Sequence, residues 1–237
     1  MPNLDVSLVL PCFNEAETFS DSVKKIINVL DNSGFSWEII FVDDASRDST
    51  KKLIQNILRK YPKKRIQAIY HQKNLGRGQT VMDGINQAQG RIVGFIDIDL
   101  EVSQEYLPSF FKALEKGYDS AIAWRIYDFT IAGFFRWFSS KGYTLIRKII
   151  LGLPYKDTEA GYKFFNRSKI LAVIKKCHNK GWFWDTEIMA GIYKAHLKTI
   201  EIPVVFIRRQ DKTSTVRLIP DSFKYLKDLI NFRLNYE

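Results

Sequence analysis

Apolar runs of strand length alternate with amphipathic helical segments throughout residues 4–100, and this alternation constrains the fold more than any other feature of the sequence. Each run is followed by turn residues and then by apolar residues at helical spacing. The predicted strands are Val6–Leu10, Glu38–Val42, Arg65–Tyr70 and Ile92–Ile96. Short connections of this kind are typical of a mostly parallel sheet with right-handed crossovers, covered by helices on both faces. The sequence therefore predicts a three-layer α/β/α domain.

The alternation becomes less regular after Glu101, although no linker, repeat or low-complexity tract interrupts the chain. The pattern predicts helices over Ser103–Lys116, about 130–151, Ile170–Lys176 and from about Pro220, strands over Ser120–Ala123 and Glu201–Ile207, and a polar loop over Asp157–Lys163. We therefore predict a single domain over residues 1–237. Residues of about 101–215 would elaborate the first half, which covers about 4–100, and residues 216–237 would form a C-terminal amphipathic helix.

Acidic residues follow two of the predicted strands directly. Asp43 and Asp44 end the second strand, and Asp97, Asp99 and Glu101 follow the fourth. Parallel strands bring their carboxyl ends to one edge of the sheet, where ligands bind in open α/β folds. Carboxylate oxygens suit a hard divalent cation that also grips substrate phosphates, so Mg²⁺ or Mn²⁺ is the expected cofactor. The simpler alternative is an acidic turn that caps the following helix.

The glycine-rich phosphate-binding motifs of dinucleotide-binding proteins and P-loop NTPases are both absent from the sequence, which argues against those two classes. The formal net charge of +10 nevertheless indicates an anionic partner: a nucleic acid, a phosphorylated substrate or a membrane surface. The helix predicted over 130–151 is basic and aromatic, so it can lie in a membrane interface or pack on the core.

The N-terminus leads straight into a strand, and no apolar run reaches the roughly 20 residues that a membrane span needs. The two cysteines, Cys12 and Cys177, are far apart and suggest free thiols in a reducing compartment. We therefore expect a cytoplasmic protein that contacts a membrane only peripherally, on its cytoplasmic face.

Several short segments, taken together and in order, resemble the family-two glycosyltransferases of the GT-A fold. Within that family they are similar to the polyprenyl-phosphate mannosyl- and glucosyltransferases. The matching segments are Pro11–Glu15, Val42–Thr50, Asn74–Gly78, Asp97–Asp99, Asp157–Lys163 and Trp184–Glu187. Each segment alone is a weak signal, but their common order covers nearly the whole chain.

The resemblance implies a role for individual residues. The nucleotide sugar would be bound by Pro11, Phe13, Glu15, Val42, Asp43, Asp44, Lys73, Gly76, Asp97 and Ile98. The metal would be held by Asp97, Asp99 and Glu101, and the acceptor phosphate by Arg125, Arg136, Ser140 and Arg209. The implied reaction moves a hexose from GDP-mannose or UDP-glucose to a dolichyl or undecaprenyl phosphate.

Two departures from the family pattern affect these expectations. Lys212 stands where relatives favour glycine, so the loop after Arg209 is hard to predict. The C-terminal membrane helices that many relatives carry are absent, which makes a separate membrane-anchoring protein a further candidate partner.

The chemistry of the acceptor determines whether a base is needed. A lipid monophosphate is largely dianionic near neutral pH and can attack the sugar directly, which inverts the anomeric centre. A saccharide or other hydroxyl acceptor requires a general base, for which Asp157, Asp185 and Glu187 are the candidates. We expect Asp157, Asp185 and Arg125 to be the catalytic residues, although Asp157 can also cap a turn and Asp185 can begin a helix.

Two other classes remain open. Acids at strand ends also suit a non-enzymatic receiver or nucleotide-binding module, but the arginine-rich second half argues against it. The positive charge also permits nucleic-acid binding, which we expect to be weak and nonspecific.

Overall fold

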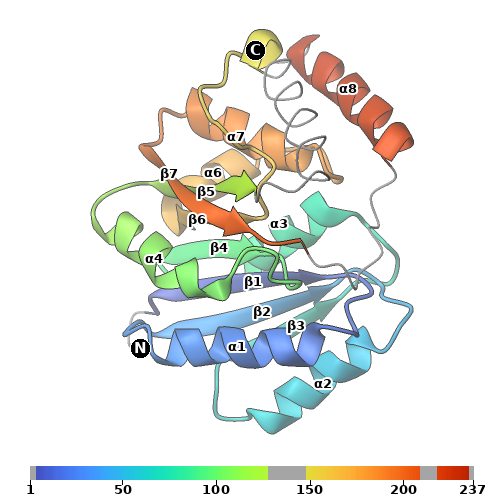
Figure 1. Cartoon of the computed structure of the whole chain (residues 1–237), viewed down its shortest axis with the longest axis vertical. Coiled ribbons are helices and arrows are strands. Elements are labelled where there is room, and N and C mark those ends of the chain that lie inside the picture. Colours follow the sequence, from blue (N-terminus) through green and yellow to red (C-terminus); the bar gives the residue numbers. More distant parts are fainter. Residues whose placement is uncertain (1–3, 128–147, 209–217, 235–237) are drawn as a thin grey trace.

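In the computed structural model, which describes residues 4–127, 148–208 and 218–234, one mixed sheet forms the centre of the protein (Figure 1). Its order is β3-β2-β1-β4-β6-β5-β7. The strands are β1 (Val6–Cys12), β2 (Trp37–Asp43), β3 (Ile66–Tyr70), β4 (Ile92–Ile96), β5 (Ser120–Tyr127), β6 (Tyr162–Asn166) and β7 (Thr199–Phe206). Strand β6 pairs antiparallel with both β4 and β5, and the other pairs are parallel. The predicted mostly parallel α/β fold is thereby confirmed.

Helices cover both faces of this sheet (Figure 1). One face carries α1 (Phe19–Asp31), α2 (Thr50–Lys60) and α4 (Leu107–Glu115), the last preceded by the short 3₁₀ helix η1 (Gln104–Tyr106). The opposite face carries α3 (Arg77–Gln87), α6 (Arg167–Ile174) and α7 (Trp184–Lys194). The C-terminal helix α8 (Leu218–Leu234) packs beside α7, where Phe232 contacts Phe183.

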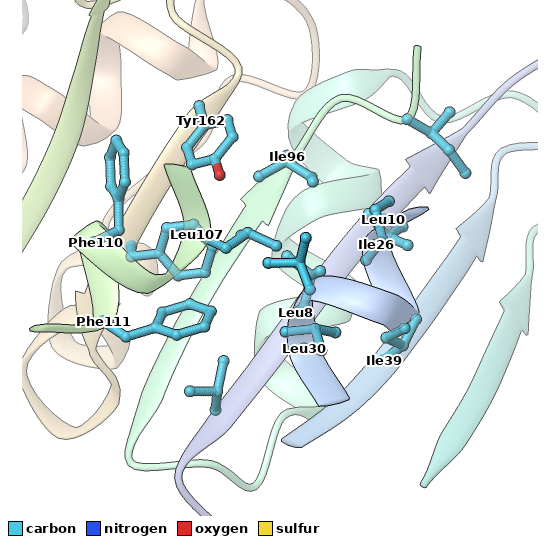
Figure 2. Packing of buried hydrophobic residues seen from close by; sticks show 14 of the residues in the cluster. Leu8, Leu10, Ile26, Leu30, Ile39, Ile96, Leu107, Phe110, Phe111 and Tyr162 are labelled. Atoms are coloured by element: carbon cyan, nitrogen blue, oxygen red, sulfur yellow. The ribbon is translucent and has the colours of Figure 1, made fainter. Parts of the chain in front are cut away.

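The two faces of β1 illustrate why these strands are apolar along their whole length. Leu8 and Leu10 belong to the cluster under α1 and α4, while Val9 between them belongs to the cluster under α3. Figure 2 shows Ile26 of α1 lying by Leu10 and Leu30 lying by Leu8. A strand buried on both faces has no solvated side that would favour polar residues.

Strand β6 differs from the expectation for the second half, which placed a polar loop over Asp157–Lys163. Its residues pair with β4 and β5, so a strand begins at Tyr162 inside the predicted loop. The apolar pattern is short and contains Lys163, which is fully buried. Such a buried lysine is rare because its charge requires a partner, and that partner is remote in sequence.

Parts of the predicted second half lie outside the described residues. These include most of the helix expected over 130–151, together with Arg136, Ser140 and Arg209. Residues 148–151 are helical, and the final helix begins at Leu218, close to the predicted start. Within the described ranges, every helix is too short or too polar to span a lipid bilayer.

Candidate active site

A cavity of about 510 Å³ opens at the edge of the sheet where the parallel strands end. Because β6 runs antiparallel, its first residue reaches this same edge. The cavity brings together many of the residues predicted for the site: Pro11, Phe13, Glu15, Asp44, Gly76, Asp97, Ile98, Asp99, Glu101 and Arg125. It also contains Trp182, together with Arg77, Glu159 and Arg208, to which the sequence analysis gave no individual role.

The remaining predicted residues within the described ranges do not line this cavity. Val42 is buried in the core beneath α3, and the side chain of Lys73 is exposed. Asp157 and Asp185 lie behind the wall, where each pairs with an arginine that reaches the cavity.

The loops after β1 and β2 are tied together by side chains of the second loop. The hydroxyls of Ser46 and Thr50 accept hydrogen bonds from the backbone N–H groups of Asn14 (3.0 Å) and Glu15 (2.8 Å). Asn14 and Ala45 have φ angles of 56° and 60°, a conformation that costs non-glycine residues energy. The cross-loop hydrogen bonds hold this strained backbone at the rim of the cavity.

Asp44 and Asp43, at the end of β2, have different surroundings. The Asp44 carboxylate accepts hydrogen bonds from the backbone N–H groups of Leu75 (2.8 Å) and Gly76 (2.9 Å), and it contacts His71. Asp44 therefore anchors the loop that leads into α3. Asp43 is also buried, but its Oδ1 atom has no hydrogen-bond partner among the residues that the structure describes. A buried carboxylate oxygen without a donor is costly, so this atom is suited to a ligand N–H.

A chain of ion pairs runs from the end of β4 into α7. The Arg77 guanidinium donates to Asp97 through Nη1 and to Asp185 through Nε, the latter at 3.1 Å. The Lys163 ammonium donates to the other oxygen of Asp185 at 2.5 Å. Gly161 lies so close that a Cβ atom there would stand 1.8 Å from the Asp97 carboxylate. Glycine at this position therefore lets β6 approach the acids of β4.

The acids Asp97, Asp99 and Glu101 all line the cavity, but they do not form a closed cage. In the part of the chain that the structure describes, no three Asp, Glu, His or Cys side chains converge tightly enough to hold a metal ion. This donor set still fits Mg²⁺ or Mn²⁺, because such ions commonly take one or two carboxylates and complete their shell with water and substrate phosphates.

Arg125, at the end of β5, forms a two-pronged ion pair with Asp157. Its Nε and Nη2 atoms donate to the two carboxylate oxygens at 2.7 and 3.0 Å, and its backbone N–H donates at 3.3 Å. Burial by itself would raise the pKa of Asp157, but the Arg125 guanidinium outweighs that effect and lowers it. Asp157 therefore stays ionised and holds the arginine against the cavity wall.

Glu159 is a further acid in the cavity wall, and sequence reasoning missed it. Its Oε1 atom accepts hydrogen bonds from the hydroxyls of Thr158 (3.1 Å), Thr186 (2.5 Å) and Tyr225 (3.0 Å). Burial, followed by the neighbouring Asp185 charge, raises the pKa of Glu159 to about 7. The only sequence signal was its position inside the segment Asp157–Lys163, because Thr186 and Tyr225 come from remote helices.

This raised pKa predicts how stability depends on pH. An acid whose pKa is higher in the folded state stabilises the fold below its unfolded pKa, and this contribution is lost as pH rises through about 7. The Glu159→Gln variant should therefore gain about 2 kcal/mol of unfolding free energy relative to the wild type between pH 5 and pH 8. Urea denaturation at both pH values measures this difference. Parallel pH profiles for the two proteins would contradict the assignment.

Comparison with known proteins identifies the family. Residues 7–173 match the model described as Glycosyl transferase family 2. An undecaprenyl-phosphate 4-deoxy-4-formamido-L-arabinose transferase of Edwardsiella ictaluri is 28% identical over 223 residues, which cover 90% of this chain and 63% of that protein. A dolichyl-phosphate beta-glucosyltransferase of Saccharomyces cerevisiae is 26% identical over 251 residues, which cover 98% of this chain and 75% of that protein. The chain thus spans less than two thirds of the first of these relatives.

Solved structures show the same fold at lower identity. The glucosyl-3-phosphoglycerate synthase of Mycobacterium tuberculosis, in complex with Mn²⁺, UDP and glucosyl-3-phosphoglycerate, superposes with a TM-score of 0.70 at 17% identity. That match covers 96% of this chain and 79% of the synthase. The mannosyl-3-phosphoglycerate synthase of Rubrobacter xylanophilus gives a TM-score of 0.74 at 17% identity. That match covers 98% of this chain and 74% of the synthase. With the family model matched over most of the sheet, this chain belongs to glycosyl transferase family 2.

Proposed function

We propose that this protein transfers a hexose from a nucleotide sugar to the phosphate of a polyprenyl lipid at a membrane surface. The names of the two relatives above support a polyprenyl phosphate as the acceptor. Family membership also favours an enzyme over a non-enzymatic nucleotide-binding module.

One observation carries the choice of acceptor: two of the three acids expected to act as bases, Asp157 and Asp185, are already engaged by cations. The third, Glu187, lies outside the cavity lining and accepts from the backbone N–H groups of His178 and Asn179. Asp157 is paired with Arg125, and Asp185 is paired with both Arg77 and Lys163. A carboxylate held in this way is a poor proton acceptor, because the cations stabilise its ionised form. A phosphate acceptor needs no base, so these ion pairs are compatible with direct attack on the anomeric carbon and inversion there.

The donor would lie along the ends of β1, β2 and β4. Pro11 and Phe13 supply cavity wall for a base and ribose. Asp43 remains the predicted partner of the base edge, although its side chain lies buried behind the cavity lining. Asp97 and Asp99 would hold the Mg²⁺ or Mn²⁺, with Glu101 as a third ligand, and the ion would stabilise charge on the departing nucleoside diphosphate. GDP-mannose and UDP-glucose are both compatible with these groups.

The acceptor phosphate would lie on the other side of the cavity. Arg125 and Arg208 line it there, and Asp157 keeps Arg125 charged and oriented. Arginine forks bind phosphate oxygens through paired N–H groups, so these side chains are suited to an anionic acceptor. Arg136, Ser140 and Arg209 remain predicted partners of the same phosphate.

Apolar side chains beside the cavity support contact with a lipid. Ile126, Val205 and Ile207 are 45, 46 and 68% exposed at the ends of the paired strands β5 and β7. They alternate with Arg125 and Phe206, which line the cavity. An exposed apolar group next to a phosphate site suits a lipid with an anionic head. We therefore propose peripheral binding at the cytoplasmic face of a membrane, and a separate anchoring protein remains a prediction.

Glu159 favours a second candidate function, transfer to a saccharide or other hydroxyl. This acid lines the cavity, and its pKa of about 7 is suited to accepting a proton from a hydroxyl near neutral pH. In that reaction Glu159 would serve as the general base in place of the expected Asp157 or Asp185.

A product assay tests the two functions. The protein is given Mn²⁺ or Mg²⁺ with GDP-mannose or UDP-glucose and a short polyprenyl phosphate in detergent. Lipid-linked sugar from one donor would establish the proposed reaction, and the Glu159→Gln variant should then keep most of the rate. Release of nucleotide without a lipid product, together with a loss of about 10²-fold or more in Glu159→Gln, would establish a hydroxyl acceptor instead.

A further inference from the structure

Arg77 occupies a position that the surrounding backbone strictly defines. It is the first residue of α3 and lies between two glycines. Gly76 has a φ of 92°, and a Cβ atom there would stand 2.5 Å from the carbonyl oxygen of Lys180. A Cβ atom at Gly78 would stand 2.5 Å from the side chain of Trp184. Both glycines therefore bring Arg77 close to α7 and its preceding loop.

The guanidinium of Arg77 lies between two acids and two aromatic rings. Its Cζ atom is 5.6 Å from the centre of the Phe95 ring and 5.5 Å from that of Trp182. Nε binds Asp185, while Nη1 binds Asp97. The Arg77 side chain is only 12% exposed, whereas that of Asp97 is 42% exposed. Arg77 is therefore held firmly by Asp185 and the rings, and its pair with Asp97 faces the cavity.

The Asp97 carboxylate cannot fully bind both the Arg77 guanidinium and a metal ion at the same time. Its Oδ1 atom accepts from Arg77, and its Oδ2 atom lies against the backbone of Gly161. The backbone N–H of Asp97 also donates to the Gly161 carbonyl at 3.0 Å, which limits movement of the residue. A divalent ion at Asp97 must therefore compete with the guanidinium for a carboxylate oxygen.

We propose that Arg77 and the divalent cation exchange at Asp97: the guanidinium neutralises this acid in the empty site, and it turns its Nη1 to the donor's diphosphate when the metal–nucleotide complex binds. This inference rests on the proposed function, because it needs a diphosphate donor. The Nε bond to Asp185 keeps the arginine in the cavity throughout the exchange. Arginine is suited to this change of partner because its fork matches carboxylate and phosphate alike.

The exchange has a measurable consequence for metal binding without nucleotide. Removal of the Arg77 charge leaves Asp97 open to the metal, so Arg77→Gln should bind Mn²⁺ about tenfold more tightly than the wild type. Addition of UDP or GDP should cancel or reverse this advantage, because the variant lacks the phosphate contact. The free Mn²⁺ signal in electron paramagnetic resonance reports both affinities without any turnover.

Two variants act as controls. Arg91 also bridges two acids, with Nε 3.0 Å from Asp5 and Nη2 2.9 Å from Glu115, but it lies at the opposite edge of the sheet. Arg91→Gln should therefore leave Mn²⁺ binding unchanged. Arg77→Lys keeps the charge without the fork and should bind Mn²⁺ with an affinity between those of the wild type and Arg77→Gln. It also provides a folded comparison if thermal melting shows that Arg77→Gln is unfolded.

The outcomes separate this inference from the proposed function. Mn²⁺ binding to Arg77→Gln that equals or falls below that of the wild type would overturn the exchange, as would an absence of Mn²⁺ binding by every protein with nucleotide present. Tighter binding by Arg77→Gln in a protein that transfers sugar to no lipid phosphate would support the exchange while the proposed acceptor fails.

Discussion

Replacement of Asp99 by asparagine is expected to lower turnover by about 10²–10³-fold while the protein stays folded. Asp99 lines the cavity wall two residues beyond Asp97 and is a proposed ligand of the metal that supports the leaving diphosphate. Loss of one preorganised electrostatic contact to developing charge typically has an effect of this size. Asparagine keeps an Oδ1 atom that can accept the backbone N–H of Glu101, at 3.3 Å in the wild type, so the local turn should persist.

The matched control for this variant is Asp31→Asn. Asp31 pairs with Lys64 at 2.6 Å, and its side chain is 43% exposed at the end of α1 away from the cavity. Exposed pairs contribute about 1 kcal/mol or less, so this control should melt almost like the wild type and keep its rate. Full activity of Asp99→Asn with either metal would refute the assignment of Asp99 as a ligand.

The sequence alone predicted the first half of the sheet closely. The fourth strand was predicted over Ile92–Ile96, which are its bounds in the structure, and the second differs by one residue at each end. The bounds of these strands were predictable because both faces of each strand are buried, so that each appears in the sequence as a continuous apolar run bounded by turns. The same parallel arrangement brings Asp44, Asp97 and Asp99 to one edge of the sheet, as the acids at the ends of the predicted strands indicated, whereas Arg125 was assigned to the site only by the family resemblance.

What could not be predicted depends on contacts between distant segments. Arg77 and Asp185 are 108 residues apart, and Glu159 is held by Tyr225, which is 66 residues away. The periodicity of a helix or strand carries no information about such pairs. Strand β6 was missed for the same reason, since Lys163 looks polar until its partner Asp185 is known.

The second large effect concerns stability and comes from this buried lysine. Lys163→Met should lower the free energy of unfolding by about 3–5 kcal/mol. The lysine side chain is fully buried, and its ammonium lies 2.5 Å from Asp185 and 2.6 Å from the carbonyl oxygen of Ala160. Methionine has a similar length but supplies no N–H. The Asp185 carboxylate, whose side chain is only 3% exposed, therefore loses one of its two cations and keeps only Arg77. Thermal and urea unfolding measure the change.

Lys169→Met is the matched control, because it separates burial from pairing. Lys169 approaches Asp119 to 2.6 Å, nearly the same distance, but its side chain is 49% exposed. Water can replace the lost partner there, so the expected cost is about 1 kcal/mol or less. The double variant Lys163→Met/Asp185→Asn should be less destabilised than the sum of its single variants, because it leaves no uncompensated charge. Equal losses in Lys163→Met and Lys169→Met would mean that the buried pair contributes no more than a surface one, and that Arg77 alone suffices to neutralise Asp185.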